Sequence, residues 1–148
     1  MHFKRLLVAI DGSAGSDLAL AAAVTVARRD RTVLTLLTVG RDATADCAAW
    51  SASGIAALPP SQTEDDAIAT RALREAVERI PQDVSVQTLV RRGRPGPQIV
   101  CEAREGIYDA VLMGARGVGR VGALVGSVSQ YVLHHSPIPV FVAHAPHG

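Results

Sequence analysis

The sequence predicts an α/β fold in a single domain, residues 1–148, with an open five-stranded parallel sheet and helices on both faces. Two observations carry this prediction. Short apolar runs alternate along the chain with segments whose apolar residues recur at helical spacing, and such alternation favours a parallel sheet that is covered on both faces. A chain of 148 residues of which 48% are hydrophobic also suits one domain with a substantial core.

Five apolar segments are expected to form the strands. Each has the length of a strand and is rich in Val, Ile and Leu, as strands buried on both faces are. The expected strands are residues 3–10, 31–39, 84–90, 109–113 and 138–142. The segments between them carry the helical pattern, and turn residues or prolines mark their ends. The expected helices begin after the turn 11–13 and span about 63–80, 95–106 and 127–135.

Residues 40–62 form the least regular part of the chain, rich in Ala, Ser and Asp. A connection of this length without secondary structure is uncommon in a compact domain. Two interpretations stay open: a tolerated surface insertion, or a lid or partner contact.

Composition and charge exclude several classes of protein. The formal net charge is only +1, so no strong field would attract nucleic acid, and no nucleic-acid partner is expected. The chain lacks an apolar run on the order of 18 residues, and its N-terminus lacks the pattern of a signal peptide. Cys47 and Cys101 lie far apart and do not form a disulfide framework. We therefore expect a cytoplasmic protein with no membrane contact.

A glycine-rich stretch follows the fourth expected strand, from Gly114 to Ser127. Glycine lets backbone N–H groups approach an anion closely, and the next helix begins at Gly126 and Ser127, where free N–H groups favour a phosphate. Arg116 and Arg120 add positive charge, and the chain contains no Asp or Glu after residue 109. The stretch therefore predicts a nucleotide phosphate site, with a merely flexible loop as the alternative.

Two better-known phosphate motifs do not explain this stretch. Residues 117–122 match G-x-G-x-x-G, but they follow the fourth strand rather than the first, and no acidic residue follows to bind a ribose. The pattern G-x-x-x-x-G-K-[ST] is absent, which excludes a P-loop NTPase.

Three further groups of residues lead to separate expectations. Asp11, Val39 and Gly114 each follow or end an expected strand, so they are candidates to meet at the carboxyl edge of the sheet. His134 and His135 are adjacent and do not share a helix face, so no metal site is predicted. A small basic cluster, Arg91, Arg92 and Arg94, is interpreted mainly as a solvated face, with phosphate contact or docking as the alternative.

Several segments together resemble the universal stress protein family, and the resemblance covers nearly the whole chain. It rests on residues 4–13, 36–39, 109–114, 126–128 and 136–140. The resemblance implies a Rossmann-like, adenine nucleotide alpha hydrolase-like fold. The ATP-binding branch of the family carries G-x2-G-x9-G-[ST], which Gly114, Gly117 and the pair Gly126 and Ser127 match. Only eight residues separate Gly117 from Gly126, so the loop is one residue short.

The resemblance also implies roles for individual residues. Asp11 would lie beside the adenosine, although an Asx turn with Ser13 would also satisfy its carboxylate. Val39 would line the adenine pocket, although ordinary core packing explains it as well. The expected nucleotide-binding residues are Ala9, Asp11, Val39, Met113, Gly114, Arg116, Gly117, Gly126, Ser127 and Val128.

The sequence thus predicts a regulatory protein of the stress response that binds ATP, with or without Mg²⁺. The resemblance implies a homodimer joined through the last strand, residues 138–142, and no catalytic residue is assigned. Two alternatives remain: slow ATP hydrolysis or another phosphoryl transfer that relies on Asp11, the one acid placed for it, and a dimeric adaptor that binds no nucleotide.

Overall fold

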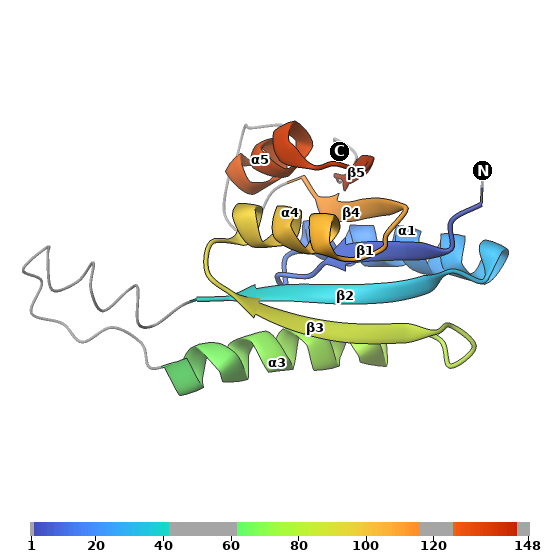
Figure 1. Ribbon diagram of the computed structural model, residues 1–148. Helices are drawn as coiled ribbons and strands as arrows, with labels where there is room; N and C mark the ends of the chain where they lie inside the picture. The colour runs from blue at the N-terminus through green and yellow to red at the C-terminus, as the bar shows by residue number, and fades with distance from the viewer. Residues whose placement is uncertain (1, 42–61, 116–125, 145–148) are drawn as a thin grey trace, which may run out of the picture.

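The computed structural model describes residues 2–41, 62–115 and 126–144. The sheet has five parallel strands in the order β3-β2-β1-β4-β5 (Figure 1). The strands are β1 (Arg5–Ala9), β2 (Val33–Gly40), β3 (Val86–Arg92), β4 (Ala110–Gly114) and β5 (Val140–Ala143). The predicted open parallel sheet is therefore confirmed. Most of the irregular segment 40–62 lies outside the described residues.

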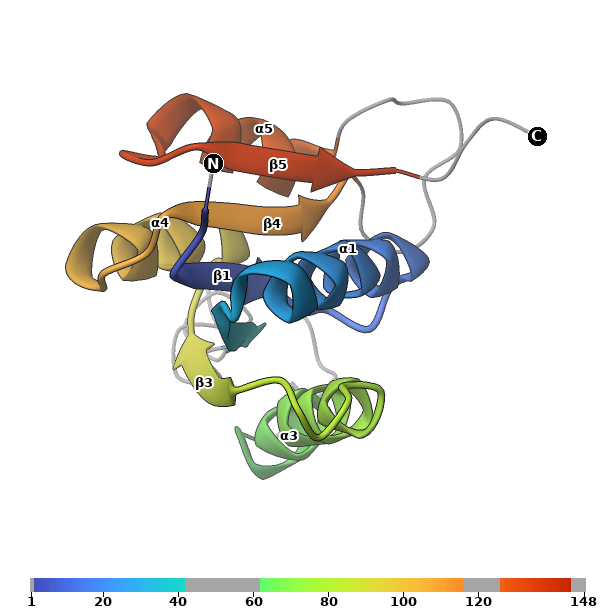
Figure 2. The ribbon, with the colours of Figure 1, turned by 90° about the vertical axis from the view of Figure 1, so that its right-hand side faces the viewer.

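The helices cover both faces of the sheet. They are α1 (Ala14–Asp30), α3 (Gln62–Glu78), α4 (Pro95–Glu105) and α5 (Ser127–His135). Figure 2 shows α1 and α3 on one side of the sheet and α4 and α5 on the other. This arrangement follows from the connections, because a right-handed crossover between parallel strands places each helix on a face.

The two faces have separate apolar cores, because successive side chains of a strand point to opposite faces. Leu6 and Val8 of β1 belong to the core under α1 and α3. Leu7 of β1 and Val111 of β4 belong to the core under α4 and α5, together with Val132 of α5. Strands buried on both sides explain why their sequences are apolar runs rather than alternating patterns.

All five strands begin one or two residues later than the sequence predicts, and the cause is plain for β3 and β5. Strand β3 starts at Val86, because the N–H of Val84 donates to the carbonyl of Pro81 in a turn, 3.1 Å away. Strand β5 starts at Val140, because the preceding Ile138 bonds to the hydroxyl of Ser136 through both its N–H and its carbonyl. Both differences arise from local turns that an apolar run does not reveal.

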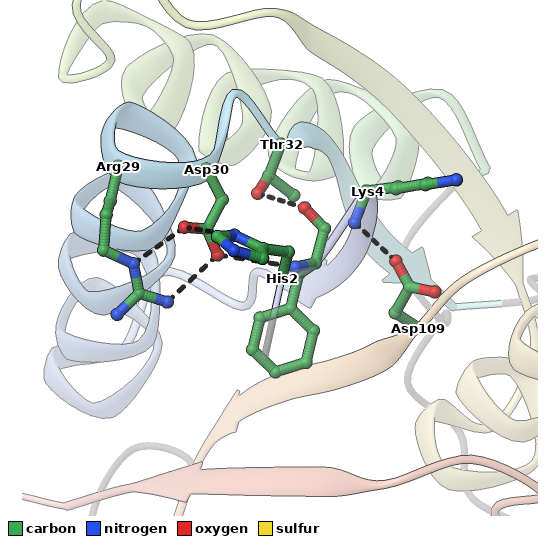
Figure 3. A network of polar contacts seen from close by, with 7 residues as sticks. His2, Lys4, Arg29, Asp30, Thr32 and Asp109 are labelled. Carbon is green, nitrogen blue, oxygen red and sulfur yellow. Dashed lines mark hydrogen bonds and ion pairs between the residues drawn. The ribbon is translucent and has the colours of Figure 1, made fainter.

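The amino edge of the sheet is closed by polar contacts among the chain's own groups (Figure 3). Asp109, just before β4, accepts the backbone N–H groups of Lys4 at 2.6 Å and Arg5 at 2.9 Å. These two bonds, that of Arg5 first, lower the pKa of the Asp109 carboxyl. Asp30, at the end of α1, accepts two bonds from the guanidinium of Arg29, which hold its pKa well below the usual range. The bonds of Asp109 thereby connect the start of β1 to the start of β4, its neighbour in the sheet.

Candidate functional site

The carboxyl edge of the sheet contains the switch point of the fold. The chain builds outward from β1 to β2 and β3, then returns to place β4 on the other side of β1. Ligands of open α/β sheets bind at the point where the strand order reverses. A cavity of about 230 Å³ lies there, between the ends of β1, β2 and β4.

The cavity gathers the residues that the sequence nominated. Its walls are mostly apolar side chains, to which a few polar groups are added. Of the predicted residues, those that line it are Ala9, Asp11, Val39, Met113, Gly114, Gly126, Ser127 and Val128. Arg116 and Gly117 lie outside the described residues. The predicted residues thus meet around one cavity, although Ala9 and Val128 lie 119 positions apart in the chain.

The size of the cavity indicates how it would be filled. Pockets that enclose a whole drug-sized ligand measure roughly 300–1,000 Å³, and this cavity is smaller. It is therefore large enough for only part of a ligand of that size. Gly126 and Ser127 supply part of that lining at the start of α5.

Asp11 sits in a turn that fixes its carboxylate. Its Oδ1 atom accepts the N–H of Ser13 at 2.9 Å, which is the Asx turn that the sequence suggested. Ser13 in turn caps α1, because its hydroxyl accepts the N–H of Ser16 at 3.2 Å. A carboxylate has two oxygens and about four lone pairs. The turn therefore holds Asp11 in place and leaves acceptor capacity at the cavity wall.

Gly114 is required by packing as well as by its place in the motif. A Cβ atom at position 114 would lie 2.5 Å from the carbonyl carbon of Gly15 and 2.8 Å from the amide nitrogen of Ser16. The start of α1 therefore rests directly on the end of β4. This contact with α1 could not be predicted from the sequence, because no local motif encodes it.

The start of α5 brings backbone donors to the cavity. Gly126 is the N-cap residue and makes no side-chain cap bond, while its own N–H donates to the carbonyl of Ala115 at 2.6 Å. The first N–H groups of a helix have no acceptor within the helix, and the helix dipole places partial positive charge there. Ser127 and Val128 line the cavity at this point, so the arrangement favours an anion.

Further residues line the cavity that sequence reasoning missed. Pro95 and Ile99 come from the first turns of α4, Leu37 from β2, Ser16 from α1 and Ser129 from α5. The spacing of Pro95 and Ile99 places them on one side of a helix. This spacing is the one feature of the sequence that groups the two residues. Nothing in the sequence says that this side of α4 faces the cavity rather than only the core.

The basic cluster near the end of β3 is paired with carboxylates. Arg91 lies 2.7 Å from Glu102 and 3.1 Å from Glu105 of α4, and Arg92 lies 2.6 Å from Asp66 of α3. Neither arginine is among the residues that line the cavity. These contacts tie β3 to a helix on each face. The predicted solvated face is therefore wrong for Arg91, whose side chain is only 23% exposed, whereas that of Arg92 is 55% exposed.

Within residues 2–41, 62–115 and 126–144, no group of three or more His, Cys, Asp or Glu side chains could hold a metal ion. The helices of the same ranges include none that is long and apolar enough to cross a membrane. His135, one of the two adjacent histidines, has its Nδ1 atom 2.8 Å from the carbonyl of Tyr131.

These features define a class of protein: Rossmann-like α/β domains with a ligand cavity at the switch point and a helix N-terminus beside it. The chain belongs to the universal stress protein family, because the model of that family matches residues 2–144. It is 33% identical over 147 residues to the universal stress protein YxiE of Bacillus subtilis, which covers 95% of this chain and 98% of that relative.

Solved structures of universal stress proteins have the same fold. The protein UspA from Lactobacillus plantarum superimposes with a TM-score of 0.76 at 24% identity, covering 97% of this chain and 99% of its own. A universal stress protein in complex with cAMP has a TM-score of 0.65 at 22% identity, and the match covers 97% of this chain and 98% of that protein. The Arabidopsis thaliana protein At3g01520 with AMP bound has a TM-score of 0.68 at 18% identity, and the match covers 95% of this chain and 90% of that protein. At these identities the likeness establishes the fold.

Proposed function

We propose that this chain binds an adenine nucleotide, chiefly ATP, in the cavity at the ends of β1, β2 and β4. It would act in the cytoplasm as a regulatory homodimer in the stress response. The observation that carries the proposal is the convergence of every described candidate residue on that one cavity, beside the start of α5. Two solved members of the family are complexes with cAMP and AMP, which supports the choice of ligand class.

The inner part of the cavity suits an adenosine. Ala9 and Val39 offer apolar surface from two neighbouring strands, and Ile99 offers it from α4. A purine ring buries its faces favourably against such side chains. Asp11 supplies an acceptor at the wall for the hydroxyl groups of a ribose, and hydrogen bonds to a charged group are stronger than neutral ones.

The outer part of the cavity suits the phosphates. The N–H groups at the start of α5 and the hydroxyl of Ser127 are donors, and the helix end adds partial positive charge. We assign Ser127 and Val128 to phosphate binding, with Gly126 allowing the close approach. Arg116 and Gly117 complete the proposed set. Any Mg²⁺ would arrive with the phosphates, since this ion usually keeps several waters and binds through substrate oxygens.

The proposed homodimer is joined through β5, which is an edge strand. The carbonyls of Pro139 and Ala143 accept N–H groups from the β4 side. Because backbone groups of alternate residues point to opposite sides of a strand, those of Val140 and Val142 point to the outer edge. Such an edge is a template for pairing, and Phe141 is 49% exposed beside it. A second copy would pair antiparallel across a two-fold axis.

Titration of thermal stability with ATP tests the proposed site. Purified protein should gain stability as ATP is added, by about 2.7 kcal/mol at a hundredfold excess over the dissociation constant. Inorganic triphosphate and CTP serve as ligand controls, because they lack the adenine. A variant with both Gly126→Val and Ser127→Ala should lose the response. An equal shift in that variant, or no shift in the wild type, would refute the site; the second result would favour the nucleotide-free adaptor.

A further inference from the structure

Helix α5 is held to the rest of the domain by two buried side chains and by partly buried ones such as Val128, which packs against the core under α4 and α5. It has nine residues, of which only Ser129 and Val132 are buried. Tyr131 adds a contact on the surface, where its ring packs against Gly96 of α4 at a distance that leaves no room for a Cβ there. Val132 and Tyr131 both lie in the middle of the helix. Ser129 is therefore the one buried side chain in its first turn.

The hydroxyl of Ser129 joins that first turn to the end of β4. Its Oγ atom lies 2.8 Å from the carbonyl oxygen of Gly114 and 2.9 Å from that of Ala115, and the residue is 2% exposed. A serine hydroxyl carries a single proton, so the two carbonyls share it. That proton is not available to a ligand, although Ser129 lines the cavity. Ser129 would therefore act on a ligand through the position of α5.

The peptide that receives this bond is itself held firmly. Gly114 packs against the backbone of Gly15 and Ser16, so it cannot move toward α1 without a clash. Ala115 accepts the N–H of Gly126 at 2.6 Å and donates its own N–H to Ala143 at 2.8 Å. The first turn of α5 is thus bonded to residues 114–115, and these residues also contact the start of α1 and the end of β5.

We propose that Ser129 is a positioning residue that holds the first turn of α5 so that the N–H groups of Ser127 and Val128 face a bound phosphate. Its effect on binding rests on the proposed function; its effect on the helix does not. Loss of the hydroxyl would leave the adenosine end of the cavity as it is and misplace the phosphate donors. Ser129 therefore determines how strongly the site prefers a phosphorylated ligand over a nucleoside.

Calorimetric titration of ATP and of adenosine tests the effect on binding. Ser129→Ala should lower the ratio of ATP affinity to adenosine affinity by about fivefold or more, the equivalent of one net hydrogen bond. Ser129→Thr keeps the hydroxyl and should restore much of the ratio. The matched control is Ser136→Ala, which removes a hydroxyl bonded 2.8 Å from the carbonyl of Ile138 at the other end of α5. That control should leave the ratio unchanged.

Hydrogen exchange of the ligand-free protein tests the positioning directly. Ser129→Ala should speed exchange of the Gly126 amide and of the first turn of α5, and Ser136→Ala should not. Unchanged exchange in Ser129→Ala would overturn the proposal. So would an unchanged affinity ratio in a protein that binds ATP. A third outcome separates the two proposals: the wild type binds no adenine nucleotide, but exchange in Ser129→Ala is faster as expected. The proposed function and the preference for a phosphorylated ligand would then be wrong, whereas the role of Ser129 in positioning α5 would be confirmed.

Discussion

The two edges of the sheet use similar polar residues in opposite ways. At the amino edge, Asp30 accepts hydrogen bonds from the Arg29 side chain, and Asp109 accepts one from the backbone of Lys4 (Figure 3). Asp109 also accepts one from the backbone of Arg5. At the carboxyl edge, Asp11 lines a cavity beside the start of α5. Polar groups that satisfy one another stabilise the fold, whereas polar groups arranged around a hollow are available to a ligand. The edges therefore predict different consequences for the same kind of substitution.

The largest effect should come from Gly114→Ala at the carboxyl edge. The added Cβ would collide with the backbone of Gly15 and Ser16, so α1 must move away from β4. We expect ATP binding to be lost and unfolding free energy to fall by about 1–3 kcal/mol, as overpacking typically does. The matched control is Gly40→Ala at the end of β2, where the nearest atom to a Cβ is 3.8 Å away. Calorimetry and denaturant unfolding of both variants measure the difference, and equal behaviour would contradict the packing role of Gly114.

Val140→Pro should remove the proposed dimer. Proline lacks the N–H that would pair across the outer edge of β5, and it leaves the carbonyls of Pro139 and Ala143 free to bond to β4. Light scattering should report monomer or aggregate in place of dimer. Lysine in place of exposed Phe141 is a second probe of the same edge, since a charge discourages edge pairing. A dimer that survives both substitutions is joined elsewhere.

The substitution of Asp by Asn separates the two edges most cleanly. Asp11→Asn keeps the Asx turn, because an amide oxygen also accepts the N–H of Ser13, but it removes the charge at the cavity wall. ATP affinity should fall about tenfold or more, with unfolding free energy nearly unchanged. Asp109→Asn should do the reverse: it should cost about 1 kcal/mol of stability through weaker bonds to Lys4 and Arg5, and leave affinity as it is. Calorimetry measures the ATP affinity of the two variants, and urea unfolding measures their stability. If both variants changed affinity and stability by similar amounts, the two edges would not differ in role.

The smallest expected effect is the acid sensitivity of the amino edge. Asp30 and Asp109 have folded pKa values below their ordinary value of 3.8, so the unfolded state binds more protons as pH falls. Stability from these carboxylates is present above that ordinary value and is lost as pH falls through the folded values. Urea unfolding between pH 6 and pH 3 should show a decline that is shallower in Asp109→Asn. A steeper decline in the variant would contradict the assignment.

The fold was accessible from sequence because both of its signals are local. Apolar runs such as Leu6 to Ile10 and helical stripes such as Leu73 and Val77 identify elements without any knowledge of their partners. Alternation then predicts parallel pairing, and the order β3-β2-β1-β4-β5 agrees with it. The sequence placed all five strand starts one or two residues too early. For β3 and β5 the reason is the turns at Pro81 and Ser136, which depend on local hydrogen bonds that an apolar run does not reveal.

The site was only partly accessible. Asp11, Val39 and Gly114 could be placed because residues that end parallel strands meet at one edge. Ser129, Pro95 and the contact between Gly114 and α1 could not, because they depend on how helices rest against that edge. The short glycine loop with Arg116 and Gly117 lies outside the described residues, so its contribution stays a prediction.

Native mass spectrometry with added ATP tests the central claim most directly. Gently purified protein should carry adenine nucleotide or take it up on titration, and saturate at one nucleotide per chain. Asp11→Asn should reach the same ratio only at higher ATP, whereas Asp109→Asn should match the wild type. If the wild type stays at the mass of the bare chain across millimolar ATP, or binds CTP equally well, the carboxyl edge is not an adenine nucleotide site.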